Sequence, residues 1–336
     1  MSAKVAVVGA GSWGTALANL LARKGVPTVL WSHEADVAEA IEREHRNPRY
    51  LSEVPLDPRL RATPVMAEAV RGAEVVVSVS PSHVVRPVMA EAARDMRPDA
   101  LVVSASKGIE VETLETMDVV LEGVLPREAA LGATYLSGPS FALEVGLGQP
   151  TAVTIASRSS RSAQRAQELF QTEYFRAYTS SDVVGVEIGG ALKNVIAIAA
   201  GVAEGLGFGN NTRAALITRG LAEITRLGVA LGANPLTFAG LAGMGDLILT
   251  CTGALSRNRS VGLELGEGRK LPEILAGMTQ VAEGVRTARS AHDLACRQGI
   301  EMPIVDAVHA VLFEELEPRI AVERLMLREP KAEHWG

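Results

Sequence analysis

The chain has 336 residues, 47% of them apolar and 21% charged, with a formal net charge of −6. This length suffices for two domains, and the composition is that of an ordinary soluble globular protein. Because the net charge is negative and no long basic run occurs, broad binding to nucleic acid or to an anionic membrane is disfavoured. An anionic ligand would therefore need a local pocket of cations or backbone amides.

The cysteine content and the N-terminal segment indicate the compartment. The two cysteines, Cys251 and Cys296, form no CxxC pair, which disfavours a disulfide framework and a structural zinc site. A strand begins almost at the N-terminus without a secretion-signal pattern, and no uninterrupted apolar run reaches about 18 residues. We therefore expect a cytoplasmic protein with no metal and no stable membrane insertion.

Residues 1–180 alternate short apolar strands with segments rich in Ala, Glu and Arg that are typical of helices. Several strands are continuous apolar runs, as expected of parallel strands that are covered on both faces. The alternation favours an α/β fold with a Rossmann-type, doubly wound parallel sheet. The predicted strands are Val5–Val8, Thr28–Trp31, Glu74–Val79, Leu101–Ser104, Thr134–Ser137 and Ala152–Ala156.

The first strand leads into a GxGxxG loop at Gly9, Gly11 and Gly14, and a helix begins within this loop. Gly9 permits a tight turn, Gly11 lets a pyrophosphate approach the backbone, and Gly14 lets the helix pack on the strand. The helix N-terminus favours an anion. A bare GxGxxG motif is weak, but here it lies within a βαβ pattern, which is the context of a dinucleotide site.

The second strand is followed by Ser32, His33 and Glu34. An acid that selects NAD usually ends this strand, and Ser32 in its place permits NADPH, because an acid there would repel the 2′-phosphate. His33 could bind that phosphate, or it could be an exposed loop histidine. Glu34 would instead repel the 2′-phosphate of NADPH, so the sequence does not decide between NADH and NADPH.

Two loops follow later strands at their carboxyl ends, where ligands bind in doubly wound sheets. Lys107 comes shortly after the strand that ends at Ser104, and the segment Ser137–Ala142 offers backbone amides and hydroxyl groups. Each loop alone could be a plain connection. Together, the loops at strand ends favour a binding site.

The pattern changes after Tyr178, and residues 181–336 contain apolar segments of helical length without a convincing strand. Ser181 or Asp182 can cap the first helix, in which apolar residues recur at helical spacing. We therefore predict an all-helical second domain that packs closely on the first. Its further helices are predicted at 212–231, 235–240, 259–266, 272–277, 284–298, 304–315 and 319–327.

Lys193 lies in the almost wholly apolar first helix of this half. Only six of the 33 basic residues are lysines, so arginine is the usual cation of this chain and a lysine here is unusual. A lysine can release its proton whereas an arginine cannot, and burial lowers a lysine's pKa towards the range of efficient acid–base catalysis. Gly189 and Gly190 precede it by about one turn and cost roughly 1 kcal/mol each in helix stability, which suits a close approach beside the amine. Alternatively, these glycines pack against another helix and Lys193 extends to solvent.

Two polar segments occur further along this half. Gly243–Asp246 is predicted to be a turn that presents the carboxylate of Asp246. Ser256–Arg259 combines hydroxyl, guanidinium and amide donors, which suit a phosphate group. The same segment could instead be a helix N-cap with a solvated charge.

Taken together, these motifs resemble the NAD(P)-dependent glycerol-3-phosphate dehydrogenases of bacterial type over nearly the whole chain. A departure is conservative, since Ser78–Ser80 stands where a valine-proline-serine turn is more usual. The resemblance implies a Rossmann domain at 1–180, a helical domain at 181–336, and a homodimer in the cytoplasm that supplies glycerol phosphate for phospholipid synthesis. The segments that carry it are Gly9–Ala16, Ser106–Gly108, Ser137–Ala142, Glu187–Asn194, Gly207–Asn211, Ala242–Asp246, Leu249–Thr252 and Ser256–Arg259.

The resemblance also implies roles for individual residues, with Lys193 as the catalytic acid–base. The cofactor, NADPH or NADH, would contact Ser12, Trp13, His33, Lys107, Ala142, Arg257, Val281 and Glu283, besides the glycine loop at Gly9, Gly11 and Gly14. The substrate, dihydroxyacetone phosphate or sn-glycerol 3-phosphate, would contact Lys107, Gly138, Ser140, Lys193, Asp246, Ser256, Arg257 and Asn258.

We expect NAD(P)H to deliver hydride to C2 of dihydroxyacetone phosphate while the ammonium group of Lys193 donates a proton to the developing alkoxide. Lys107 would add positive charge near the substrate oxygens. Two alternatives are a related dehydrogenase of a hydroxyacid or sugar acid, and a nucleotide-sensing module without chemistry. The presence of Lys193, Asp246 and Arg257 disfavours the sensing module.

Overall fold

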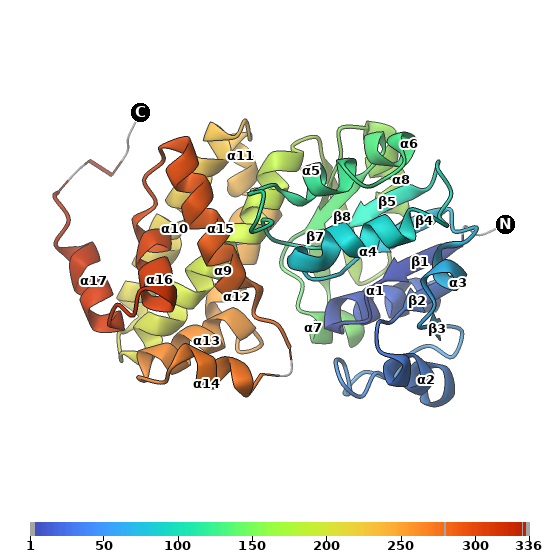
Figure 1. The fold of residues 1–336 in the computed structure, drawn as a ribbon, viewed down its shortest axis with the longest axis horizontal. Helices are drawn as coiled ribbons and strands as arrows, with labels where there is room; N and C mark the ends of the chain where they lie inside the picture. The colour runs from blue at the N-terminus through green and yellow to red at the C-terminus, as the bar shows by residue number, and fades with distance from the viewer. Residues whose placement is uncertain (1–3, 279, 331, 334–336) are drawn as a thin grey trace.

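The computed structural model describes residues 4–278, 280–330 and 332–333. Figure 1 shows a part that is built around a β-sheet, next to a part that is built from helices. The sheet part extends to Ser180, and the helical part begins with the helix that starts at Val183. The predicted fold class, a Rossmann-type sheet followed by helices, is confirmed.

The sheet has eight strands in the order β3-β2-β1-β4-β5-β6-β7-β8. Apolar residues alternate between its two faces: Val5 and Val7 belong to one buried cluster, and Ala6 and Val8 belong to another. Both faces of the sheet are therefore covered. The strands are β1 (Val5–Val8), β2 (Thr28–Trp31), β3 (Arg61–Thr63), β4 (Val75–Ser78), β5 (Leu101–Ser104), β6 (Thr134–Ser137), β7 (Thr151–Ala156) and β8 (Phe175–Ser180).

The sheet departs from the predicted parallel arrangement at one pair, because β6 and β7 run antiparallel. The chain leaves β6 at the carboxyl edge and enters β7 from the same edge, so the loop at 138–150 stays there. All the other neighbouring strands are parallel. The sequence analysis missed β3 and β8, which lie at the two ends of the sheet.

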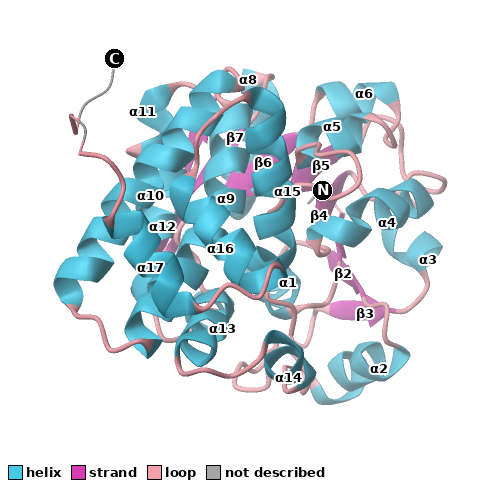
Figure 2. Ribbon diagram, turned by 60° about the vertical axis from the view of Figure 1, so that its left-hand side comes forward, coloured by secondary structure: helices cyan, strands magenta, loops and turns pink. Residues whose placement is uncertain are grey.

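Helices cover the sheet on both sides, as the coloured elements of Figure 2 show. Residues of α1 and α8 join the cluster that contains Val5, and residues of α3, α4 and α5 join the cluster that contains Ala6. The helices of this part are α1 (Ser12–Arg23), α2 (Ala35–Glu44), α3 (Met66–Val70), the 3-10 turn η1 (Ser82–Val84), α4 (Val85–Ala92), α5 (Met117–Glu122), α6 (Arg127–Leu131), α7 (Ala142–Gly146) and α8 (Ser160–Phe170).

The helical part is arranged around the long helix α9 (Val183–Gly205), which the side chain of Asp182 caps by accepting a hydrogen bond from the Gly185 amide at 3.0 Å. The predicted helices are all present, with ends shifted by a few residues. They are α10 (Asn210–Ala230), α11 (Pro235–Phe238), α13 (Arg257–Gly266), α14 (Leu271–Ala276), α15 (Glu283–Gln298), α16 (Pro303–Phe313) and α17 (Pro318–Met326).

The predicted turn at Gly243–Asp246 is wrong. Leu241–Gly245 forms one turn of π-helix, η2, with a hydrogen bond from the Gly245 amide to the Gly240 carbonyl at 3.1 Å. Asp246 then begins helix α12 (Asp246–Thr252). The carboxylate is therefore held on a helix rather than on a flexible turn.

Two helical segments among the described residues are long and apolar enough to cross a membrane, Val183–Gly205 and Pro235–Thr252. In the first, 83% of the apolar 18-residue window is buried inside the protein, and in the second 39% is buried. The high burial of Val183–Gly205 identifies it, as helix α9, as the core helix of the helical part. Its apolar residues pack against α10, α12, α13 and α15.

Helix α13 lies unusually close to α9 because glycines face the contact. A Cβ atom added at Gly201 would overlap the carbonyl oxygen of Arg259, and one added at Gly262 would overlap that of Ile198. These are backbone atoms, so a clash can be relieved only if the two helices separate.

Gly201→Ala is expected to lower the free energy of unfolding by about 1–3 kcal/mol, because the overlap with Arg259 outweighs the gain of roughly 1 kcal/mol in helix propensity. Denaturant or thermal unfolding measures the change. Gly277→Ala is the control, because Gly277 has helical φ and ψ at the end of α14 and a Cβ there would lie 3.5 Å or more from its neighbours. Unchanged or higher stability of Gly201→Ala would contradict the packing argument.

Candidate active site

The glycine loop after β1 has the shape that a dinucleotide requires. Gly9 has φ of +121°, and a Cβ at Gly14 would overlap the Gly9 carbonyl oxygen, so both positions need glycine. A Cβ at Gly11 would meet nothing within 4 Å, which leaves open space above the start of α1. No side chain caps this helix, so its first amides can bind an anion. The loop therefore fits the pyrophosphate of NAD(P).

Segments from both parts of the protein meet beside this loop. The Ser12 hydroxyl lies 2.7 Å from the Tyr50 carbonyl oxygen and 2.9 Å from Oε1 of Gln280. Gln280 immediately precedes Val281, which is 42% exposed, and Glu283 begins α15. The structure thus brings the Val281–Glu283 segment towards the glycine loop. The indole Nε1 of Trp13 is buried and has no hydrogen-bond partner among the described residues.

Lys193 and Lys107 share one carboxylate. Nζ of Lys193 donates to Oδ1 of Asp246 at 2.5 Å and to Oγ1 of Thr250 at 3.0 Å. Nζ of Lys107 donates to Oδ2 of Asp246 at 2.7 Å and lies 3.4 Å from the Gly138 carbonyl oxygen. Asp246 is 1% exposed and Lys193 is 8% exposed. The alternative in which Lys193 extends to solvent is therefore wrong.

The surroundings of this Lys107–Asp246–Lys193 cluster set its protonation. Burial disfavours the charged amine and lowers the pKa of Lys193 to about 8, although the Asp246 carboxylate opposes this shift and the Lys107 ammonium adds to it. Burial also opposes ionisation of Asp246, but the two lysines outweigh it and hold the pKa of that carboxyl below its usual value. Lys193 can consequently titrate beside a carboxylate that stays ionised.

Gly189 and Gly190 of α9 let neighbouring segments approach this helix closely, as predicted. A Cβ at Gly189 would lie 2.6 Å from the Ala242 carbonyl oxygen, so α9 contacts the π-turn directly there. A Cβ at Gly190 would lie 2.7 Å from Oγ of Ser137 and 3.7 Å from the Lys107 side chain. Gly189 thus serves packing, and Gly190 leaves room for the strand-end loops beside the cluster.

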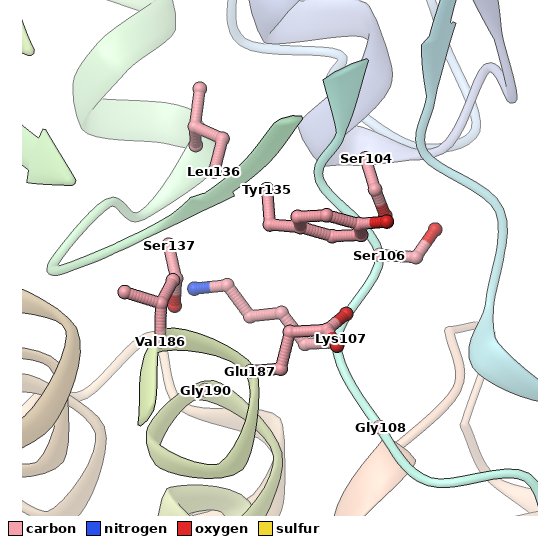
Figure 3. A pocket seen from close by; sticks show the side chains of 10 residues that line it. All are labelled: Ser104, Ser106, Lys107, Gly108, Tyr135, Leu136, Ser137, Val186, Glu187 and Gly190. Atoms are coloured by element: carbon pink, nitrogen blue, oxygen red, sulfur yellow. The ribbon is translucent and has the colours of Figure 1, made fainter. Parts of the chain in front are cut away.

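A small cavity lies behind the cluster, between the carboxyl ends of β5 and β6 and the first turns of α9 (Figure 3). Its volume of ≈ 10 Å³ is about that of one water molecule. The Lys107 side chain runs past it towards Ser137. Three buried oxygens on its lining residues lack a hydrogen-bond partner among the described residues: Oγ of Ser104, Oγ of Ser137 and Oε1 of Glu187.

The cavity is also lined by an acidic residue, Glu187, which was not predicted as a site residue. Its Oε2 accepts a hydrogen bond from the Asp118 amide at 3.1 Å. Burial and the negative charge of Asp118 raise the pKa of Glu187 well above its usual value. The neutral form of this acid is therefore favoured over its carboxylate, compared with an exposed glutamate.

The Ser256–Arg259 segment is the N-terminus of α13, so the N-cap interpretation is confirmed. Oγ of Ser256 accepts a hydrogen bond from the Arg259 amide at 3.3 Å. Asn258 is buried and ties three helices together, because its amide donates to Asn194 at 2.9 Å and its oxygen accepts from the Gly284 amide at 2.9 Å. Arg257 is exposed and makes no hydrogen bond or salt bridge within the described residues.

Arg257 nevertheless interacts electrostatically with Glu283, as do the two lysines of the cluster. Burial raises the pKa of Glu283, and the positive charges of Arg257, Lys107 and Lys193 oppose this shift. A phosphate at the start of α13 would have both the free guanidinium and the helix N-terminus as donors. The N-cap and a phosphate site are therefore compatible.

The other predicted site residues lie around the same edge of the sheet. Oγ of Ser140 donates to the Gly138 carbonyl at 2.9 Å, and Ala142 begins α7. His33 is exposed, and its ring is 6.1 Å from that of Trp31. Within the described residues, no hydrogen bond or salt bridge joins His33 to the Lys107–Asp246–Lys193 cluster.

The fold and this cluster together define a class: a dehydrogenase that uses NAD(P) and carries a titratable amine at the carboxyl edge of its sheet. The comparisons with known proteins specify the family. Residues 4–163 match the sequence model of the NAD-dependent glycerol-3-phosphate dehydrogenase N-terminus, and residues 182–323 match that of its C-terminus. The chain therefore belongs to the glycerol-3-phosphate dehydrogenase family.

Full-length relatives agree. The chain is 57% identical over 335 residues to "Glycerol-3-phosphate dehydrogenase [NAD(P)+]" of Geobacter sulfurreducens, covering 100% of both chains. It is 57% identical over 330 residues to the protein of the same name from Myxococcus xanthus, covering 98% of both. Among solved structures, glycerol-3-phosphate dehydrogenase from Coxiella burnetii aligns with a TM-score of 0.93 at 38% identity, covering 97% of this chain and 99% of that one.

Proposed function

We propose that the protein catalyses the reversible reduction of dihydroxyacetone phosphate to sn-glycerol 3-phosphate with NADH or NADPH. The observation that carries this proposal is the pair Lys193 and Lys107 on one buried carboxylate, Asp246, at the carboxyl edge of a dinucleotide-binding sheet. Family membership over the whole chain supports it. The division into a cofactor domain at 1–180 and a substrate domain at 181–336 belongs to the same proposal.

The chain's own residues would hold the two reactants. The glycine loop with Ser12 and Trp13 holds the cofactor, which supplies hydride when it is bound. The start of α13, with Ser256, Arg257 and Asn258, binds the substrate phosphate through the free guanidinium and the amide end of the helix. The remaining contacts that we assign to the cofactor are His33, Lys107, Ala142, Val281 and Glu283, and those to the substrate are Gly138, Ser140 and Asp246.

Lys193 moves the proton. In reduction its ammonium group donates to the oxygen on C2, and in oxidation the neutral amine accepts that proton. Asp246 fixes Nζ of Lys193 and stabilises the ammonium before transfer, while Lys107 keeps a positive charge beside the developing alkoxide. Release of the proton is made easier because burial has already lowered the pKa of Lys193.

A steady-state assay tests the proposal. We expect oxidation of NADH and NADPH by dihydroxyacetone phosphate, and no comparable turnover of β-hydroxyacids with NAD(P)⁺. Exclusive turnover of hydroxyacids would favour the related-dehydrogenase alternative. Binding of NAD(P)H without oxidation by any phosphorylated ketose would favour a sensing module.

The pH dependence should have opposite signs in the two directions, because Lys193 must be charged in reduction and neutral in oxidation. With a pKa of about 8 for Lys193, kcat/KM for reduction should be level below this pH and fall above it. For oxidation, kcat/KM should rise with pH through the same region. Initial rates in matched buffers in both directions measure this, and profiles with the same sign in both would exclude Lys193 as the proton carrier.

The oligomeric state, the cellular location and the metabolic role of the enzyme are also proposals. A homodimer is supported by partly exposed apolar side chains on the helical part, among them Met244, Ile248 and Leu255. A cytoplasmic location and the supply of glycerol phosphate for phospholipid synthesis belong to the same proposal, which family membership supports. Size-exclusion chromatography with light scattering would test the dimer, since a monomer at working concentration would exclude it.

A further inference from the structure

Tyr50 connects the glycine loop to the segment that follows β2. Its carbonyl oxygen lies 2.7 Å from the Ser12 hydroxyl, and its own hydroxyl donates to Oε1 of Glu34 at 2.7 Å. Asn47 fixes this position, since its oxygen accepts from the Tyr50 amide at 3.0 Å and its Nδ2 donates to the Ala10 carbonyl at 2.9 Å. Glu34 is therefore held next to the dinucleotide loop by a partly buried, hydrogen-bonded connection.

The negative charge of Glu34 is offset only in part, by a long ion pair with Arg49 that Arg49 shares with Asp36. The nearest guanidinium, Nη1 of Arg49, is 3.7 Å from Oε1 of Glu34, beyond hydrogen-bond distance. Arg49 bonds instead to Asp36 through Nη2 at 3.1 Å, and its side chain is 45% exposed. One half-exposed cation thus faces two carboxylates, and the local balance is negative.

The position of Glu34 matters because of where a dinucleotide lies in this fold. With its pyrophosphate on the glycine loop, the adenosine ribose lies over the carboxyl end of the second strand. An acid there accepts a hydrogen bond from the 2′-hydroxyl of NADH and repels the 2′-phosphate of NADPH. Ser32 occupies the usual position of that acid and is fully buried, and Glu34 lies two residues further on, with Oε2 3.5 Å from the Ser32 hydroxyl.

We propose that Glu34, fixed by the hydroxyl of Tyr50, replaces the missing strand-end acid and biases the enzyme towards NADH and against NADPH. This inference rests on the proposed function for the identity of the cofactor. It assigns Glu34 as the residue that sets the preference and Tyr50 as its positioning residue.

The binding test uses two fragments that differ only in the 2′-phosphate, 5′-AMP and 2′,5′-ADP, titrated into the full-length protein by calorimetry. Glu34→Gln should raise the affinity for 2′,5′-ADP relative to that for 5′-AMP by about fivefold or more, the effect of removing one unit of repulsion a few Å away near a protein surface. Tyr50→Phe should shift the ratio in the same direction by a smaller factor.

The control is Glu39→Gln, which removes the same charge from an exposed pair with Arg43 on α2. It should leave the ratio of the two affinities unchanged. An unchanged ratio in both Glu34→Gln and Tyr50→Phe, or an equal change in Glu39→Gln, would overturn the proposal.

A kinetic arm separates this inference from the proposed function. The ratio of kcat/KM for NADPH to that for NADH, measured with dihydroxyacetone phosphate, should rise in Glu34→Gln by the same factor as the fragment affinities. Absence of turnover with both cofactors, together with the predicted change in fragment binding, would refute the proposed function and leave the role of Glu34 standing. Normal turnover with an unchanged ratio would refute the role of Glu34 alone.

Discussion

Lys193→Ala is expected to lower kcat for reduction of dihydroxyacetone phosphate by roughly 10² or more, the usual contribution of a positioned general acid. The substitution removes the proton donor and leaves the Lys107–Asp246 pair in place. Cofactor binding, measured by calorimetry, should stay close to the wild-type value because the glycine loop is untouched.

Lys193→Arg is the matched variant, because arginine keeps a positive charge but cannot release a proton at accessible pH. We expect it to be as slow as the alanine variant, which separates proton transfer from simple charge stabilisation. A kcat near the wild-type value in either variant would exclude Lys193 as the acid–base.

Asp246→Asn should change both stability and pH dependence. Its carboxylate is buried between two ammonium groups, and removing one partner of such an ion pair costs about 3–5 kcal/mol in the free energy of unfolding. Of the influences on the pKa of Lys193, burial and Lys107 lower it and Asp246 raises it. Without the carboxylate this pKa must fall further, so reduction should lose activity at lower pH than in the wild type.

Denaturant unfolding and the pH profile of kcat/KM measure the two effects of Asp246→Asn. Asp306→Asn is the control, since it removes a carboxylate that is paired with His292 at a partly exposed site. It should change stability by less than about 1 kcal/mol. A pH profile of Asp246→Asn that coincides with the wild-type profile would show that Asp246 does not tune Lys193.

Most of the predicted strands are buried on both faces, as Val75–Ser78 is, because continuous apolar runs are distinctive. The missed strands are at the ends of the sheet, where the signal is weaker. Arg61–Thr63 is only three residues long, and Phe175–Ser180 begins with alternating buried and exposed residues. That alternation was a usable indication of a strand covered on one face.

Site residues were predictable where one residue type was unusual for its surroundings, as Lys193 is in an apolar helix. Their contacts were not, because they join segments distant in the sequence: Lys193 with Asp246, Ser12 with Gln280, and Tyr50 with Glu34. No local pattern reveals such pairings. The roles of the remaining site residues stay predictions until substrate and cofactor binding are measured.

The π-turn at Leu241–Gly245 has a consequence for how Asp246 is aimed. Relative to an α-helical turn, a π-turn contains one additional residue, and one residue corresponds to a rotation of about 100° around a helix axis. The phase of α12 is therefore set by this single residue, with Gly189 of α9 lying directly against the turn. Were the turn to tighten to α-helical geometry, the Asp246 carboxylate would rotate away from both lysines, although every residue of the cluster would still be present.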